Sequence, residues 1–157
     1  MKPTRRDVLV TIAAAAAPPA SGQTAQLSTA EMESLKAIVD TIIPRTETPG
    51  AVDAGVPGYI ERRLVGSATL LETFRTGIAA LDAAARSRFG ASLAALGAER
   101  RLALLTANEK APFVAIVKGL TVDGYYTSQE GLTQELGWHG NTFLAEFKGC
   151  THPEHQS

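Results

Sequence analysis

Apolar side chains recur every three or four residues through most of this chain, and this spacing restricts the fold more than any other feature. Such spacing places them on one face of each of several amphipathic helices, which bury those faces against one another. No long stretch alternates as a β-strand does. The one β-rich stretch, Thr121 to Tyr126, continues a helical stripe without a turn signal. The pattern therefore predicts an all-α fold, a single small helical bundle.

The helix boundaries are predicted from capping residues, prolines and glycines. Ser28 and Glu31 form a capping-box pattern at the start of the first helix, and Pro44 ends that helix. Later boundaries are expected at Pro57, Gly66, Ser67, Gly90, Asn108 and Pro112. In the last long helix, the side chains expected to face the core are Phe113, Ile116, Val117 and Leu120. Tyr125 and Tyr126 are expected at the core and at its rim.

Two segments interrupt the helical pattern. The stretch from Pro44 to Val56 is rich in proline, glycine and small residues, so it is predicted to be a shaped loop, serving either as a helix connection or as a docking surface. From Thr127 onward, glycines and large aromatic residues such as Trp138 predict an irregular tail with helical fragments at most. Such aromatic residues either pack back on the bundle or contact a partner, and the pattern leaves both open.

The first 22 residues have the composition of a secretory signal peptide. Lys2, Arg5 and Arg6 precede an apolar run from Val8 to Ala17, and prolines and small residues follow. A run of about ten residues is too short to cross a hydrocarbon core of about 30 Å as a stable helix. The Arg5-Arg6 pair resembles the twin-arginine signal, which exports folded proteins, and an ordinary secretory signal is the alternative. We therefore expect residues 1–22 to be removed and residues 23–157 to form the exported domain.

Composition and motifs exclude several functional classes. The formal net charge of −1, without basic stretches interleaved with aromatic residues, argues against nucleic-acid binding. The sequence contains neither a glycine-rich phosphate loop after a strand nor a nucleophile elbow. Its single cysteine excludes a C-x-x-C-H haem attachment site. The sequence therefore predicts no catalytic residue and no cofactor held by this chain.

Three residues near the end, Cys150, His152 and His155, have side chains that bind metals. A closed zinc site would need a fourth ligand from elsewhere, and the spacing matches no zinc finger. A periplasmic metal-binding or redox module is therefore the alternative function. Cys150 has no second cysteine to pair with, so in an oxidising compartment it is expected either to be buried or to form a disulfide with another chain.

Two strings of sequence resemble a known family. The string IIPRTETPGAVDAGVPGYI, from Ile42 to Ile60, is similar to the hallmark of the gluconate 2-dehydrogenase subunit 3 family. The string DGYYTSQEGLTQELGWHGNTFLAEFKGCTHPEHQ, from Asp123 to Gln156, resembles the small subunits of exported flavin-dependent sugar dehydrogenases, especially the glucose dehydrogenase type. The two strings and the helices between them cover nearly the whole chain.

This resemblance implies a periplasmic accessory subunit without catalytic activity of its own. It implies an FAD-dependent catalytic partner of the glucose-methanol-choline class, usually joined by a multihaem cytochrome c, so FAD and haem belong to the partners. It also implies that Arg5 and Arg6 direct the pair to the twin-arginine export machinery and that Cys150 is bridged to the catalytic subunit. The residues expected at the partner interface are Pro44, Thr48, Pro49, Tyr59, Trp138, His152, Pro153 and His155.

Overall fold

A computed structural model describes residues 26–140 of the chain. Over this range the chain forms helices α1 (Thr29–Ile42), α2 (Val56–Val65), α3 (Ala68–Phe89), α4 (Ala98–Ala107) and α5 (Pro112–Tyr126), the 3-10 turn η1 (Leu93–Ala95) and the π-type turn η2 (Gly131–Glu135). No strand occurs between residues 26 and 140, and the predicted all-α class is confirmed. None of these helices is both long and apolar enough to cross a membrane.

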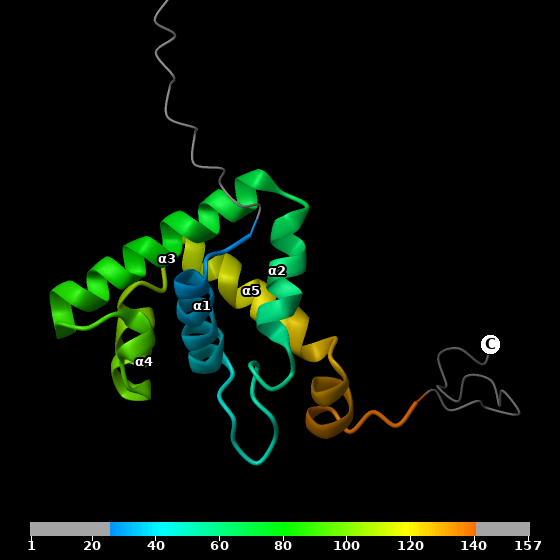
Figure 1. The fold of residues 1–157 in the computed structure, drawn as a ribbon. Helices are drawn as coiled ribbons and strands as arrows, with labels where there is room; N and C mark the ends of the chain where they lie inside the picture. The colour runs from blue at the N-terminus through cyan, green and yellow to red at the C-terminus, as the bar shows by residue number, and fades with distance from the viewer. Residues whose placement is uncertain (1–25, 141–157) are drawn as a thin grey trace, which may run out of the picture.

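Helix α1 lies at the centre of the bundle and contacts α2, α3, α4, α5 and η1. The longest helix, α3, crosses over α1 and α5, whereas α2 and α4 lie on opposite sides of α1 (Figure 1). The loop between α1 and α2 projects from the end of the bundle that faces away from α3, and η2 lies beside it (Figure 1). This end of the molecule, which we call the loop end of the bundle, therefore combines two segments that are far apart in the sequence, the α1–α2 loop and η2.

Cap geometry confirms the predicted starts of α1 and α3 and the predicted end of α3. At the start of α1, the Ser28 hydroxyl accepts from the Glu31 N–H (3.3 Å) and the Glu31 carboxylate accepts from the Ser28 N–H (2.7 Å). The Ser67 hydroxyl accepts from the Leu70 N–H (3.2 Å) at the start of α3. Gly90 ends α3 with a φ of 72°, a conformation that glycine adopts readily. Local signals in the sequence are thus sufficient to define these helices.

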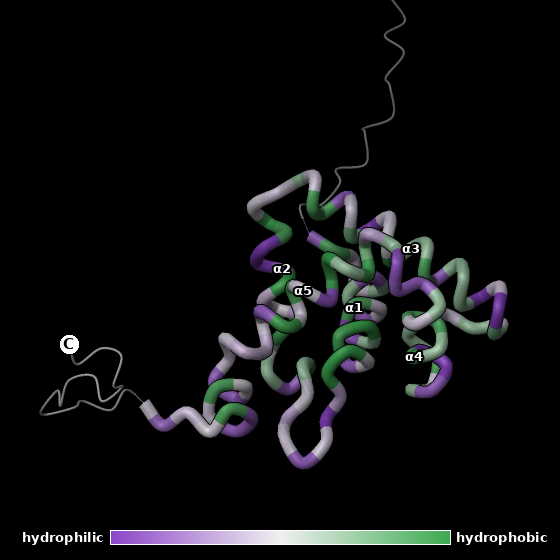
Figure 2. The backbone as a smooth tube through the Cα atoms, turned by 180° about the vertical axis from the view of Figure 1, so that it is seen from behind, coloured by the Kyte–Doolittle hydropathy of each residue, from purple (hydrophilic) through white to green (hydrophobic). Residues whose placement is uncertain are grey.

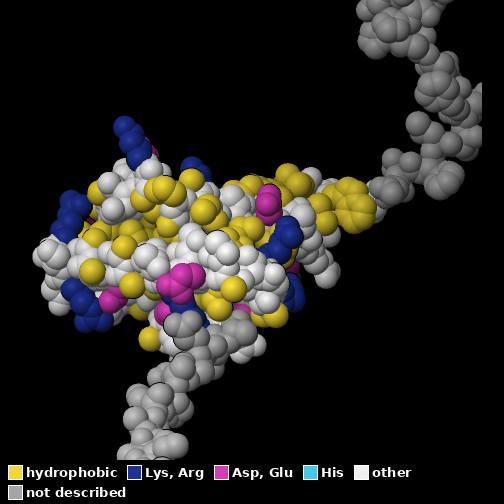
Figure 3. All heavy atoms as spheres, turned by 90° about the horizontal axis from the view of Figure 1, so that it is seen from above, with side chains coloured by type: hydrophobic (Ala, Val, Ile, Leu, Met, Phe, Trp, Pro, Cys, Tyr) yellow, Lys and Arg dark blue, Asp and Glu magenta, His cyan; other side chains and the backbone are white. Residues whose placement is uncertain are grey.

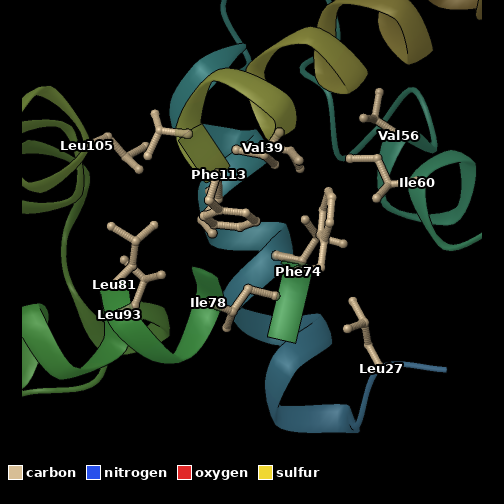
Figure 4. Close-up of a cluster of buried hydrophobic side chains, with 14 of the residues drawn as sticks. Leu27, Val39, Val56, Ile60, Phe74, Ile78, Leu81, Leu93, Leu105 and Phe113 are labelled. Carbon is tan, nitrogen blue, oxygen red and sulfur yellow. The ribbon is translucent and has the colours of Figure 1, made fainter. Parts of the chain in front are cut away.

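Phe74 of α3 and Phe113 of α5 form the aromatic centre of the core. Their ring centroids are 5.2 Å apart and the ring planes are nearly perpendicular, an arrangement favoured between aromatic rings. A Cβ at Gly77 would lie 2.1 Å from the Phe113 ring, so this glycine allows α3 and α5 to approach closely. Aliphatic side chains of α1, α2, α3, α4 and η1 surround the pair (Figure 4): Val39, Ile60, Ile78, Leu81, Leu93 and Leu105. Val117 of α5 also belongs to this core.

The structure corrects the predicted core face of α5. Val117 is buried and Leu120 is partly buried, as expected, but Ile116 is 36% exposed, so the prediction is wrong for Ile116. Because α5 is apolar on nearly every side, helical spacing alone does not mark which stripe packs inward. The packed stripe includes Val117, Thr121 and Tyr125, and Ile116 lies beyond its edge.

Candidate partner interface

Hydrogen bonds and an ion pair shape the loop between α1 and α2. The Ala51 N–H donates to the Ile43 carbonyl oxygen (2.9 Å) and closes the main turn of the loop. Just after this turn, the Asp53 carboxylate accepts from the Gly50 N–H (3.0 Å) and forms an ion pair with Arg45. The prediction of a shaped loop is therefore confirmed, and its shape depends on contacts within the loop itself.

Two glycines make this path of the chain possible. A Cβ at Gly50 would lie 2.6 Å from the Arg45 amide nitrogen and 2.9 Å from the Pro44 carbonyl carbon, so only a residue without a side chain fits. Gly55, which precedes α2, has a φ of 71° in the left-handed region that favours glycine. Pro44 lies exposed at the start of the loop.

Two hydrogen bonds fasten the loop to the carboxyl-terminal part of the chain. The Tyr125 hydroxyl of α5 donates to the Pro49 carbonyl oxygen (2.7 Å), and the Thr48 hydroxyl donates to the Glu135 carboxylate of η2 (2.7 Å). The Tyr125 ring is buried, and Pro49 supplies the partner that its polar hydroxyl needs. The two sequence strings that resemble the subunit 3 family thus meet in the structure.

Tyr59 of α2 joins the loop end of the bundle to α5. A Cβ at Gly124 would lie 2.7 Å from the Tyr59 ring, so this ring packs directly on the α5 backbone. The Arg63 guanidinium carbon lies 5.4 Å from the ring centroid, and its Nε donates to the Tyr59 hydroxyl (3.2 Å). These contacts leave Tyr59 half-buried, with part of its surface accessible to a partner.

The five predicted interface residues within the described range lie on the loop, on α2 or just after η2. Pro44 and Trp138 are exposed, Trp138 by 47%. The half-buried residues are Thr48, Pro49 and Tyr59. The Trp138 N–H donates to the Leu132 carbonyl oxygen (2.8 Å), so the backbone of this exposed residue is tied to η2. An exposed tryptophan on a fixed backbone suits a partner anchor better than a core filler.

The remaining predicted site residues lie outside the described range: Arg5, Arg6, Cys150, His152, Pro153 and His155. The Arg45–Asp53 ion pair and the hydrogen bond from Tyr125 to Pro49 were not predicted from the sequence. Opposite charges flanking a Pro-Gly turn were a usable signal for the ion pair. The expected positions of Tyr125 in the core and Tyr126 at its rim are confirmed.

Residues 26–140 contain no group of three His, Cys, Asp or Glu side chains placed to hold a metal ion. A groove of about 710 Å³ beside α3 is lined mainly by alanine and threonine, with Glu72 as its only ionisable residue. One carboxylate alone supplies no acid–base pair. The loop end of the bundle is instead a surface whose backbone is held by hydrogen bonds and which carries the exposed Trp138.

The family model for gluconate 2-dehydrogenase subunit 3 matches residues 29–143. The chain belongs to this family. The match includes the whole loop between α1 and α2, the five helices and the residues around Trp138. No curated protein and no solved structure matches the chain significantly. Gluconate 2-dehydrogenase subunit 3 is by description one subunit of a dehydrogenase complex, so a catalytic subunit is its partner.

In this subunit 3 chain, Tyr125→Phe should lower the free energy of unfolding by about 1 kcal/mol, because the half-buried Pro49 carbonyl oxygen loses its donor. Hydrogen exchange of loop amides should accelerate, while amides of α1 and α3 change little. Urea unfolding and hydrogen exchange measure these effects. The matched control is Tyr126→Phe at the exposed rim, with an expected change within about 0.5 kcal/mol. Equal effects of the two variants would contradict the fastening role of the Tyr125 hydroxyl.

The Asp53 carboxyl makes the loop of this subunit 3 chain sensitive to acid. Its pKa is lowered from the ordinary 3.8, first by the hydrogen bond from Arg45 and then by the Gly50 N–H. A lowered folded-state pKa stabilises the fold above the unfolded value, and this stabilisation is lost as the pH falls through the folded value. Asp53→Asn should therefore unfold at lower urea than wild type near pH 7, with a difference that shrinks below about pH 4. A gap that widens in acid would reject this account.

Proposed function

We propose that this chain is the non-catalytic small subunit of an exported, FAD-dependent sugar or alcohol dehydrogenase of the glucose-methanol-choline type. Its role is to bind the catalytic subunit and to serve that subunit's folding, assembly and export. The observation that carries the proposal is family membership, combined with a hydrogen-bonded loop and an exposed Trp138 at one end of the bundle. Pro44, Thr48, Pro49 and Tyr59 contribute to the contact on that surface.

The catalytic subunit depends on the small subunit for export. The catalytic subunit folds around FAD in the cytoplasm and must then cross the membrane in folded form. A leader with the Arg5-Arg6 pair on the small subunit carries both chains through the twin-arginine machinery. Binding only the native form of the partner also favours that form by mass action. The mature complex works in the periplasm and passes electrons to a multihaem cytochrome c, so FAD and haem stay with the partner subunits.

The decisive experiment is affinity purification of the tagged chain from native cells. We expect a flavin-containing dehydrogenase subunit to co-purify, with flavin absorbance and dye-linked sugar oxidation in the same fraction. The mature chain produced alone should oxidise no sugar. Turnover by the isolated chain, or a tagged chain that never carries a flavoprotein, would reject the proposal.

In the mature complex, we expect Cys150 to form a disulfide with the catalytic subunit. Non-reducing electrophoresis of the purified complex should show a heavier species that disappears in Cys150→Ser and after reduction of wild type. Intermolecular pairing is expected because the chain has no second cysteine. The His152 and His155 side chains, together with Pro153, would line the same contact. A Cys150 thiol that alkylates freely in the intact, non-reduced complex would show that no bridge forms.

A further inference from the structure

A pocket of about 280 Å³ lies between α1, α3 and η1. It opens beside the first two turns of α1, so the rest of this helix separates it from the loop end of the bundle. Figure 2 shows hydrophilic and hydrophobic residues alternating along α3, and polar side chains of α3 form one wall of the pocket. Ligand sites usually measure about 300–1,000 Å³, so this pocket admits only a small molecule.

Ser34 of α1 places a buried hydroxyl at the wall of this pocket. The residue is 7% exposed, and its side chain makes no hydrogen bond with any residue from 26 to 140. In that range, Arg101 Nε is the one fully enclosed side-chain nitrogen or oxygen without a partner, so the Ser34 hydroxyl is not sealed off from the pocket. Buried polar side chains are normally paired. An unpaired hydroxyl at a pocket wall therefore indicates an occupant that supplies its hydrogen-bond partner.

Charged side chains on the pocket walls balance one another. Arg86 Nε donates to Asp82 Oδ2 (2.7 Å), and Asp82 Oδ1 accepts from the Leu93 N–H (2.9 Å), which fixes this carboxylate. Near the start of α1, Arg75 Nε lies 3.9 Å from Glu31 Oε1. Figure 3, which looks down on α3, shows acidic and basic side chains next to one another on this side of the molecule. The pocket therefore carries two positive charges, two negative charges and no net charge.

Hydrogen-bonding groups remain available on these walls. The Arg86 guanidinium has five N–H donors, and within residues 26–140 only its Nε has a partner. Carboxylate oxygens accept more than one hydrogen bond, so Asp82 can still receive a donor. Ser92, before η1, makes no cap hydrogen bond with its side chain. Ile78 and Ala79 place apolar surface between these polar groups.

We propose that this pocket binds a small neutral polyol of monosaccharide size. An anion would meet the two carboxylates and a cation would meet the two guanidinium groups, whereas a neutral polyol avoids both repulsions. Its hydroxyl groups donate and accept, so they can bond to Ser34, Arg86 and Asp82 together. Its C–H edges rest on Ile78 and Ala79. The site lies apart from the loop end of the bundle, so the inference is independent of the proposed function.

Titration calorimetry of the mature chain with D-glucose tests the proposal. We expect one site with a dissociation constant on the order of 1 mM, as for a small ligand with few contacts. Because the polyol binds only the folded chain, glucose at about 100 mM should raise the melting temperature by about 5 °C or more. Gluconate and protonated glucosamine match glucose in size but carry a negative or a positive charge. Each should bind about fivefold or more weakly than glucose.

Two variants locate the site. Ser34→Ala removes the buried hydroxyl and should weaken glucose binding about fivefold, the effect of one lost hydrogen bond. Ala79→Leu fills the pocket from its exposed rim, and the clash should weaken binding about tenfold or more. The matched control is Ala80→Leu, the same change at the neighbouring exposed alanine, which lines the groove on another side of α3. It should keep the wild-type affinity within about twofold. Circular dichroism of all three variants should match that of wild type, because no core side chain is displaced.

Four results would overturn the inference. The first is glucose that gives neither binding heat nor a change in melting temperature. Unchanged affinity in both Ser34→Ala and Ala79→Leu would place the sugar elsewhere on the chain. Tighter binding of gluconate or of protonated glucosamine than of glucose would reject a neutral ligand. Binding that appears only after removal of residues 23–25 would assign the pocket to the chain's own amino-terminal segment. None of these results bears on co-purification of a flavoprotein, so the proposed function is tested separately.

Discussion

Phe74→Ala should lower the free energy of unfolding by about 3–5 kcal/mol, the usual loss for a buried phenylalanine. The side chain is 0% exposed and meets the Phe113 ring edge-to-face at 5.2 Å. Removing the ring would leave a cavity where α3 packs against α5. Since total stabilities are about 5–15 kcal/mol, such a loss removes a large share of the fold's stability. Urea unfolding of the mature chain, followed by circular dichroism, measures it.

The control for Phe74→Ala is Thr76→Ala on the exposed side of the same helix. It should change the free energy of unfolding by no more than about 0.5 kcal/mol. A double variant with Phe113→Ala should lose less than the sum of the two single losses, because the two rings share one contact. A loss below about 1 kcal/mol for Phe74→Ala would show that this aromatic pair does not centre the core.

Replacing Arg5 and Arg6 together by lysine should abolish most of the dehydrogenase activity in the periplasm and leave an active flavoprotein in the cytoplasm. Charge is conserved in this double variant, so a loss must come from recognition of the arginine pair rather than from the net charge of the leader. Fractionation followed by dye-linked activity in each compartment measures the distribution. The expected change in the periplasmic fraction is about tenfold or more, because folded cargo has no other route.

Lys2→Arg is the matched control for the export experiment, because it changes a basic residue of the leader outside the pair. Its periplasmic activity should equal that of wild type. Normal periplasmic activity in the Arg5/Arg6 double variant would mean that the catalytic subunit reaches the periplasm independently of this leader. The assembly role could then survive, but the export role would not.

The sequence predicted most of the helical architecture, because helix boundaries depend on neighbours in the chain. Ser28 with Glu31, Ser67 and Gly90 each act within one turn of the helix they delimit. Ile116 shows where this reasoning fails. On a helix that is apolar all round, only the contacts of the assembled bundle decide which stripe is buried, and helical spacing carries no information about them.

The candidate interface could be predicted only in part, because its long-range contacts also depend on how the helices pack. The composition of the loop indicated a turn, and resemblance indicated that Pro44 to Tyr59 and Trp138 belong to a contact surface. The hydrogen bonds that join Pro49 to Tyr125 and Thr48 to Glu135 bridge 76 and 87 residues. Such pairings depend on how α2 and α5 pack, so no local pattern reveals them.

The fastening of the loop by Tyr125 also bears on the energetics of assembly. A free loop loses about 1–2 kcal/mol of conformational entropy for each residue whose backbone becomes fixed. Here that loss is incurred when the chain folds, because the loop is already joined to α5 and η2. If the catalytic subunit binds at the proposed interface, it meets a preorganised surface, and more of the contact energy remains available for affinity.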